Sequence, residues 1–340
     1  MSFKTLQVIQ LREYGFSDLR VDSDSCFLCG SGSLPPTQEH VFPKWLQHRY
    51  NLWNKTLGLL NETKIQYKNL LIPCCARCNS EDLSRLEDRV SSAISRGFDC
   101  TSKLDSHLLY LWAGKLYFGV LRKEITLAQD RSRPHEGTIL PKESLKAFSE
   151  LHLFLQSIRG RHEFSGKPPY SVLVCNLHDL GQLRNFYFRD SLFHMTLSIR
   201  MGEVGIIVAL EDGGLTSDSY GRYVNAVAGK KLHPIQFDEL YAKVLYQVSR
   251  VEGGVTYITS KHEFDSQPAQ TLVMAGGYLR ESSQEEYSQL LRPMVSDWLH
   301  SEPDHIEWFV PPNLVPTWMT DKAGDLLLRP LSEWESSFAA

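Results

Sequence analysis

The chain has 340 residues, 42% of them hydrophobic and 22% charged, with a formal net charge of −4 at pH 7. This length allows two domains, or one domain with a large appendage, and the composition is that of an ordinary globular protein. The charge excludes a basic field over the whole molecule. Residues 1–100 hold 12 Lys+Arg against 11 Asp+Glu, and residues 101–340 hold 24 against 29, so any contact with nucleic acid has to come from a local group of cations.

The sequence also favours a cytoplasmic protein with no membrane partner. Its first residues, MSFKTLQVIQLREYGF, lack the apolar core of a secretion signal. The most apolar run, residues 108–121, is too short to cross a bilayer and contains Lys115, which indicates a buried helix instead. Seven cysteines, an odd number that includes two CxxC pairs, indicate metal binding in a reducing compartment rather than a disulfide framework.

The first hundred residues hold the most specific pattern. A CxxC pair is followed by Glu39-His40, a short predicted helix over residues 43–50 and a predicted strand over residues 69–73. A second CxxC pair then runs into a helix that we expect Asn79 to cap. Apolar residues at helical spacing mark one buried face of this helix, and Gly97 ends it. The face is formed by Leu83, Leu86, Val90 and Ile94.

The remaining 240 residues read as helices followed by a mixture of strands and helices. Helices are predicted over residues 104–127, 142–158, 234–251 and 283–300. Strands are predicted over residues 170–174, 185–188, 195–199, 204–210, 255–259 and 271–274. We therefore expect three consecutive parts: an N-terminal domain over residues 1–100, a helical connector over residues 101–165, and an α+β domain of unassigned fold over residues 166–340, with a recognition or regulatory role.

The four paired cysteines predict a structural zinc site. Cys26 and Cys29 form one pair and Cys75 and Cys78 the other, and two such knuckles supply the four thiolates of a closed tetrahedral site. Cys74 leaves an alternative open, because Cys74 and Cys78 are spaced as CxxxC. We favour Cys75 because its spacing to Cys78 matches that of the first pair.

The ordered set CxxC, Glu-His-Val-Phe-Pro, Asn-Leu and CxxC-Asn, over roughly residues 24–97, resembles the HNH (ββα-metal) endonuclease family. The similarity is to the zinc-stabilised subgroup with two CxxC knuckles and a treble-clef-like frame. The resemblance implies that His40 is the general base, that Glu39 and Asn79 ligate a catalytic Mg²⁺ or Mn²⁺ ion, and that Asn69, which precedes Leu70, braces the loop and helps to orient the histidine.

Two features depart from the compact family pattern. The insert of 28 residues between His40 and Asn69 is long, and Glu81-Asp82 stand where the family often has a basic residue. Lys44 and Arg77 are the candidate contacts to substrate phosphates.

The resemblance implies a metal-dependent endonuclease that hydrolyses DNA phosphodiester bonds, with a structural zinc ion. Fusions of this kind resemble bacterial effectors of defence against phages or plasmids. The C-terminal part, which is not basic, is expected to contact a protein partner or a small-molecule activator. The alternative is a non-catalytic zinc module that binds nucleic acid or protein, and an RNA-directed nuclease would need the same residues.

Overall fold

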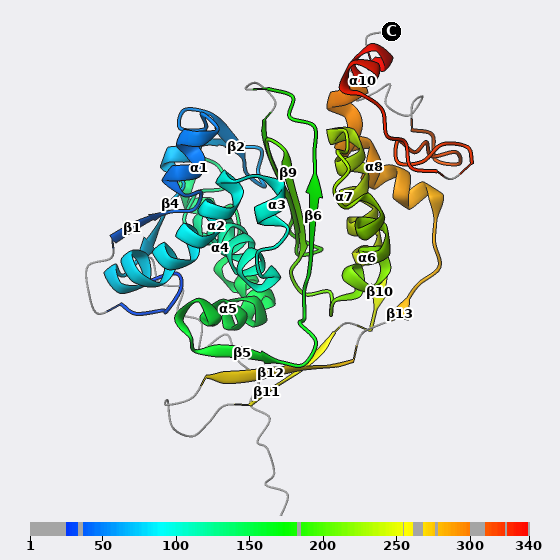
Figure 1. The fold of residues 1–340 in the computed structure, drawn as a ribbon. Helices are drawn as coiled ribbons and strands as arrows, with labels where there is room; N and C mark the ends of the chain where they lie inside the picture. The colour runs from blue at the N-terminus through cyan, green and yellow to red at the C-terminus, as the bar shows by residue number, and fades with distance from the viewer. Residues whose placement is uncertain are drawn as a thin grey trace, which may run out of the picture. The chain divides into compact units, whose positions relative to one another are not determined.

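The computed structural model describes residues 25–32, 37–181, 185–253, 255–260, 268–275, 278–299, 310–323 and 325–338 (Figure 1). The chain is mixed α+β, which confirms the coarse class expected from the sequence. It divides into two compact units. The first takes residues 1–88, 111–168 and 256–275, and the second takes residues 89–110, 169–255 and 276–340.

These units differ from the three consecutive parts expected from the sequence. The chain passes from one unit to the other five times, and two of the passages fall inside helices α2 (Ser84–Ser95) and α4 (Ser106–Glu124). A helix is held together by hydrogen bonds along its own backbone. It can therefore continue across the boundary between two units, and no turn or loop in the sequence then marks that boundary.

The first unit begins with an antiparallel strand pair followed by a helix. Strand β1 (Thr37–His40) pairs with β4 (Leu71–Cys74), so that Thr37 lies opposite Cys74 and His40 lies opposite Leu71. The chain then enters a π-helical turn, η3 (Cys78–Leu83), and continues into α2. The insert between β1 and β4 contains α1 (Lys44–Arg49), the hairpin of β2 (Thr56–Gly58) and β3 (Lys64–Gln66), and the turn η2 (Tyr67–Asn69).

The face predicted for the helix after the second CxxC pair is confirmed. Its four apolar residues, Leu83, Leu86, Val90 and Ile94, are all buried. Gly97 follows the helix with φ +84° and ψ −168°, a conformation that essentially only glycine adopts. The prediction that Asn79 is the N-cap of this helix is wrong. Arg77 is the N-cap, and Asn79 lies inside the first turn.

Helix α4 is buried over most of its length, and Lys115 lies in the middle of its apolar run with a fully buried side chain. Gly119 on the same helix allows close packing, because a Cβ there would lie 3.0 Å from Val41 Cγ1. Within the described part of the chain, no helix combines the length and the apolar character that a membrane span requires.

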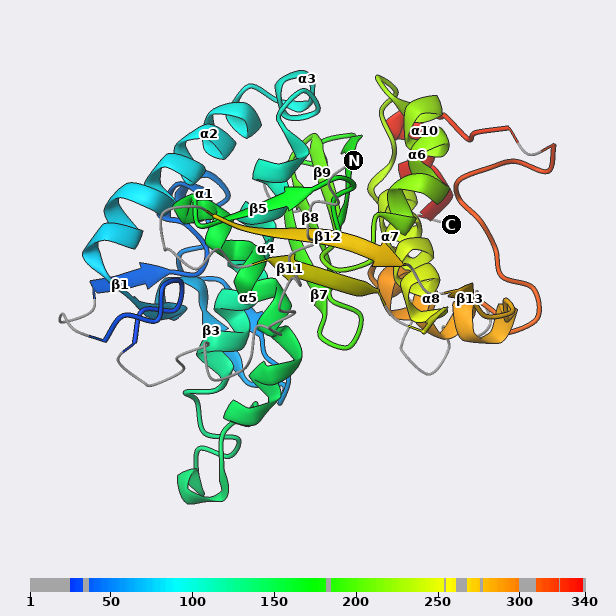
Figure 2. The same cartoon turned by 90° about the horizontal axis from the view of Figure 1, so that it is seen from below.

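The rest of the first unit packs helix against a small sheet. After η4 (Pro134–Glu136), the predicted helix over residues 142–158 is divided into η5 (Lys142–Phe148), α5 (Ser149–Leu155) and η6 (Gln156–Arg159). Strand β12 (Ala269–Ala275) lies between β11 (Thr256–Ser260), which is antiparallel to it, and β5 (His162–Ser165), which is parallel to it. Helix α5 lies beside this sheet in Figures 1 and 2, and its Phe154 ring packs edge-on against Phe164 and Tyr257.

The second unit is built on an antiparallel sheet in the order β6-β9-β8-β7. Its strands are β6 (Ser171–Asn176), β7 (Phe186–Ser191), β8 (Thr196–Met201) and β9 (Val204–Ala209), each overlapping a predicted strand. Every residue of β8 and β9 is buried. Helices α6 (Leu215–Val227), α7 (Pro234–Ser249) and α8 (Gln284–Leu299) lie together along this sheet in Figure 1, and their apolar side chains share a core with β6 and β9.

The second unit is completed by short elements. They are α3 (Phe98–Thr101), the strand pair β10 (Val251–Glu252) and β13 (Tyr278–Leu279), and α10 (Leu331–Phe338). Helix α6 was not predicted from the sequence. It begins after two consecutive glycines, Gly213 and Gly214, and carries Ser and Thr residues in its first turn, all of which weaken a helical pattern.

Candidate functional site

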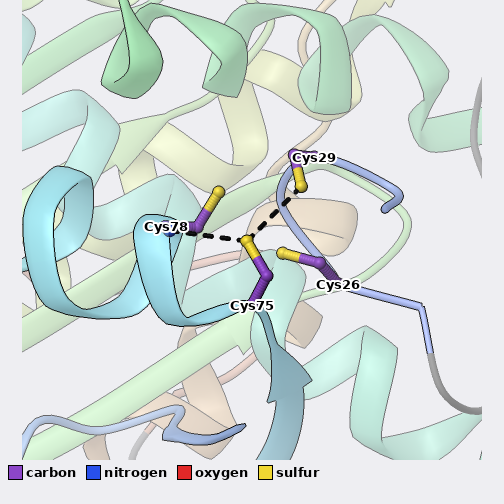
Figure 3. A group of neighbouring side chains, drawn as sticks. All are labelled: Cys26, Cys29, Cys75 and Cys78. Atoms are coloured by element: carbon purple, nitrogen blue, oxygen red, sulfur yellow. Dashed lines mark hydrogen bonds between the residues drawn. The ribbon is translucent and has the colours of Figure 1, made fainter. Parts of the chain in front are cut away.

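The structure brings the four paired cysteines together. One sulfur from each of Cys26, Cys29, Cys75 and Cys78 lies within 4.8 Å of the other three, and Figure 3 shows the four side chains facing one centre. Cys29 Sγ lies 3.7 Å from Cys75 Sγ, and the Cys78 backbone N–H points to Cys75 Sγ at 3.5 Å. These residues could hold a metal ion such as zinc, because four convergent thiolates match its preferred ligand set.

Two hydrogen bonds, one between backbone atoms and one from a side chain, hold the first knuckle against the rest of the first unit. Phe27 N donates to Pro73 O on β4 at 2.9 Å, and Gln156 Nε2 on η6 donates to Leu28 O at 2.8 Å. The second knuckle joins the end of β4 to η3 (Figure 3). An ion bound by the four sulfurs would therefore tie a loop, a strand end and a helix start together.

Cys74 lies beside this cluster but outside it. Its side chain is fully buried at the end of β4, with Sγ 3.8 Å from Cys26 Sγ. Hydrogen bonds from the thiols of Cys29, Cys74 and Cys78 lower the pKa of Cys26, and the same contacts with Cys26 raise the pKa values of Cys74 and Cys78. Sulfurs this crowded cannot all ionise by themselves, so the full set of thiolates calls for a cation.

Glu39 is held by a buried lysine. Its side chain is 9% exposed, and Oε1 accepts a hydrogen bond from Lys115 Nζ at 2.7 Å. The same ammonium donates to Glu87 Oε1 at 2.9 Å and to the backbone carbonyls of His40 and Val41 at 2.8 and 3.0 Å. Four oxygens therefore surround one ammonium and fix the end of β1.

The charges of this network depend on one another. Burial alone opposes the charge on Lys115, but the carboxylates of Glu39 and Glu87 hold its pKa above the usual value. Burial raises the pKa of Glu87, although Lys115 acts in the opposite direction. Removal of any one member would leave a charge in a poorly hydrated place.

His40 ends β1 with a half-buried side chain. Its ring stacks on Trp53 at a centroid distance of 5.9 Å, and the exposed His48 stacks on the same indole at 5.1 Å. Burial and the neighbouring charge of Lys44 lower the pKa of His40 below 6.5. The imidazole is therefore neutral at pH 7, which is the form that accepts a proton.

The two asparagines lie in different surroundings. Asn79 Nδ2 donates to Thr37 Oγ1 at 3.0 Å and to Gln38 O at 3.3 Å, so that this side chain joins the start of η3 to β1. Asn69 is exposed, and its Nδ2 lies 3.5 Å from Gln66 Oε1. The loop at this place is closed by backbone atoms, because Val41 N donates to Leu70 O at 2.8 Å.

The two candidate phosphate contacts are both exposed. Lys44 begins α1, close enough to His40 to influence its pKa. Arg77 caps η3 between the two cysteines of the second knuckle. Each can reach a polyanion without disturbing the core.

Sequence reasoning missed Lys115, Glu87 and Trp53. Lys115 did carry a signal: a single lysine in an apolar helical run has to meet buried acids or carbonyls, and Glu39 was already singled out. Glu87 on α2 follows the buried Leu83 by one helical turn, and the local sequence does not indicate that an acid there pairs with a lysine of another helix. Trp53 lies in the insert, and its contact with His40 depends on how the insert folds back.

No protein-family model matches the sequence, and comparisons with curated proteins and with solved structures found no match.

Proposed function

We propose that the protein is a zinc-stabilised endonuclease of the HNH type that hydrolyses DNA phosphodiester bonds with the help of Mg²⁺ or Mn²⁺. The observation that carries this proposal is the position of His40. A neutral imidazole ends β1, and β1 pairs residue by residue with the strand that leads into the second cysteine knuckle.

Zinc has a structural role in this proposal. Held by Cys26, Cys29, Cys75 and Cys78, it would lock the strand pair to the helix that follows. Such a frame keeps the residues on β1 and η3 at fixed positions, which is what a reacting phosphate requires.

His40 would take a proton from the attacking water. Its ring is oriented by Trp53, and its backbone carbonyl is held by Lys115. Lys44 adds a positive charge beside the imidazole, and this charge both favours the neutral ring and attracts phosphate. Arg77 is the second cation assigned to the DNA backbone.

Glu39 and Asn79 would hold the catalytic cation through Glu39 Oε2 and Asn79 Oδ1. Their other polar atoms, Glu39 Oε1 and Asn79 Nδ2, bond to Lys115 and to β1 and so orient these oxygens. Carboxylate and amide oxygens suit Mg²⁺ or Mn²⁺. When bound, the ion supplies charge stabilisation at the phosphate and at the leaving oxygen.

The proposal extends to the partners and the biological role of the nuclease, as the HNH resemblance implies them. The second unit would dock a protein partner or a small activating molecule, in a cytoplasmic protein whose nuclease acts in defence against phages or plasmids.

The decisive experiment compares two histidines that share one tryptophan. His40→Ala should lower Mg²⁺-dependent plasmid nicking by about 10²-fold or more, because the general base is lost. His48→Ala, which removes the other ring stacked on Trp53, should retain nicking. Zinc content and the unfolding midpoint serve as folding controls. Equal nicking by His40→Ala and by the unmodified protein refutes the assignment of the base.

One observation favours a second function, a non-catalytic zinc module that binds nucleic acid or protein. Lys115 already neutralises Glu39, the residue assigned to the catalytic cation. Glu39→Gln separates the two functions, since glutamine still accepts a hydrogen bond from Lys115 but binds Mg²⁺ poorly. Loss of nicking in this variant supports the nuclease. DNA or RNA binding that is unchanged in Glu39→Gln, with no cleavage of either substrate by the unmodified protein, supports the non-catalytic module.

A further inference from the structure

The second unit contains a cavity of about 230 Å³ next to the edge strand of its sheet. Phe186, Tyr187 and Arg189 line it from β7 and Arg200 from β8. The opposite wall comes from α7 and α8, through Asp238 and Trp298. The volume corresponds to roughly eight water molecules at about 30 Å³ each, which is enough for a small organic molecule.

The lining of this cavity carries two arginines and two aspartates, which differ in how deeply they are buried. Arg200 and Asp238 are both buried and pair loosely, with Arg200 Nη1 3.6 Å from Asp238 Oδ2. Trp298 Nε1 also donates to Asp238 Oδ2, at 2.7 Å. Arg189 is 14% exposed: its Nη1 donates to Met294 Sδ at 2.8 Å, and its Nη2 lies 3.7 Å from Oδ2 of Asp297, which is 68% exposed at the rim. The buried part of the cavity therefore holds two guanidinium groups and one carboxylate.

Aromatic rings orient both guanidinium groups. Arg189 Cζ lies 4.6 Å and Arg200 Cζ 5.6 Å from the centroid of the Tyr187 ring, and Arg200 Cζ lies 5.1 Å from that of Trp298. A guanidinium held against a ring keeps its N–H donors in a fixed plane, ready to bind a carboxylate or phosphate through two parallel hydrogen bonds.

We propose that this cavity binds a small organic anion that carries both a carboxylate or phosphate group and a planar ring. The anionic group would bind to Arg189 and Arg200, because Asp297, the acid beside Arg189, is mostly exposed to solvent. The planar ring would lie along Phe186 and Tyr187, and a longer ligand would extend past Asp297 into solvent. An aromatic carboxylate and a nucleoside monophosphate share this chemistry, and both belong to the proposed ligand class. The proposal is independent of the nuclease assignment, because every lining residue belongs to the second unit.

The test uses the full chain with four probes: AMP, UMP, benzoate and inorganic phosphate. Calorimetric titration and the ligand-dependent rise of the unfolding midpoint report binding. We expect at least one of the three planar anions to bind saturably and more tightly than inorganic phosphate. Arg189→Gln should weaken that binding at least tenfold, because it removes one of the two guanidinium groups. The pattern of binding among AMP, UMP and benzoate distinguishes a nucleotide from an aromatic carboxylate.

Arg280→Gln is the matched control. Arg280 makes an ion pair with Glu286 outside the cavity and is 34% exposed, so its loss should leave binding unchanged. Tyr187→Leu, which removes a ring and keeps both arginines, should weaken the planar anions more than inorganic phosphate. The proposal is overturned if no planar anion binds, if inorganic phosphate binds as tightly as they do, or if Arg189→Gln binds as the unmodified protein does.

Discussion

Lys115 fixes the position of Glu39, the acid that the sequence pattern singles out. A fully buried ammonium is tolerated only where acceptors surround it, and here two carboxylates and two backbone carbonyls do so. The same contacts fix the carbonyl of His40 and one oxygen of Glu39. Lys115 lies outside the predicted Glu-His-Val-Phe-Pro pattern and positions two residues within it.

Replacement of this lysine tests the network. Lys115→Met should lower the free energy of unfolding by about 3–5 kcal/mol, because Glu39 and Glu87 would lose their cation in a buried place. Lys123→Met on the same helix is the control. Lys123 Nζ donates to one backbone carbonyl, Leu71 O, at 3.2 Å among the described residues, so its loss should cost about 1 kcal/mol. Urea denaturation of both variants measures the difference, and similar costs would contradict a central role for Lys115.

The raised pKa of Glu87 leads to a second prediction, about how the free energy of unfolding depends on pH. An acid whose pKa is higher in the folded state than the unfolded value of 4.5 contributes stability at low pH, and this contribution is lost as the pH rises through the folded pKa. Glu87→Gln keeps an oxygen acceptor for Lys115 and does not titrate. The variant should therefore gain stability relative to the unmodified protein as the pH rises above 4.5.

The measurement is urea denaturation of both proteins in matched buffers from about pH 4 to about pH 8, with the same zinc concentration. Any release of zinc at low pH then affects both proteins alike. A difference in stability that stays constant over this range would show that Glu87 has an ordinary pKa.

At the level of elements, the structure separates the roles of two adjacent cysteines: Cys75 belongs to the group of four sulfurs, and Cys74 does not. Cys75→Ala should lower the zinc content, because its sulfur belongs to the group of four. Cys74→Ala should leave the zinc content unchanged and cost only the small loss of a buried sulfur. Metal analysis of the two purified variants measures this, and zinc loss in Cys74→Ala alone would favour the CxxxC alternative.

The sequence was a good guide to elements with strong local patterns. Leu83, Leu86, Val90 and Ile94 repeat at helical spacing, and the four strands of the larger sheet of the second unit contain apolar runs separated by turns. Convergence of the cysteines was also predictable, since each CxxC pair presents its two sulfurs together.

The elements and contacts that escaped prediction depend on distant partners. Strand β5 is short, and it pairs with β12 from more than a hundred residues later. The position of Asn79 inside a π-helical turn follows from the packing of the second knuckle on β1. A local pattern cannot specify which helix delivers Lys115 to Glu39, because that choice is made by the tertiary fold.

At the scale of the whole molecule, each unit is assembled from separated pieces of chain. A fragment of residues 25–100 contains all four clustered cysteines but lacks Lys115 and Gln156, which hold Glu39 and the first knuckle. We expect this fragment to bind zinc without a cooperative unfolding transition, because its buried acids have no cation.

Urea denaturation followed by circular dichroism tests this expectation, with a fragment of residues 25–168 as the control. The longer fragment regains both contacts and should unfold more cooperatively than the shorter one. A cooperative transition in the shorter fragment, equal to that of the longer one, would show that the knuckle domain is autonomous.

The parallel pairing of β5 with β12 has a consequence for protein synthesis. Ribosomes add about 5–20 residues per second, so β12 is made roughly 5–20 seconds after the chain has passed β5. Throughout that delay β5 lacks its neighbour, although the cysteines and His40 have long been translated. A nascent chain therefore carries the four clustered cysteines and His40 in an unfinished first unit until β12 has been made.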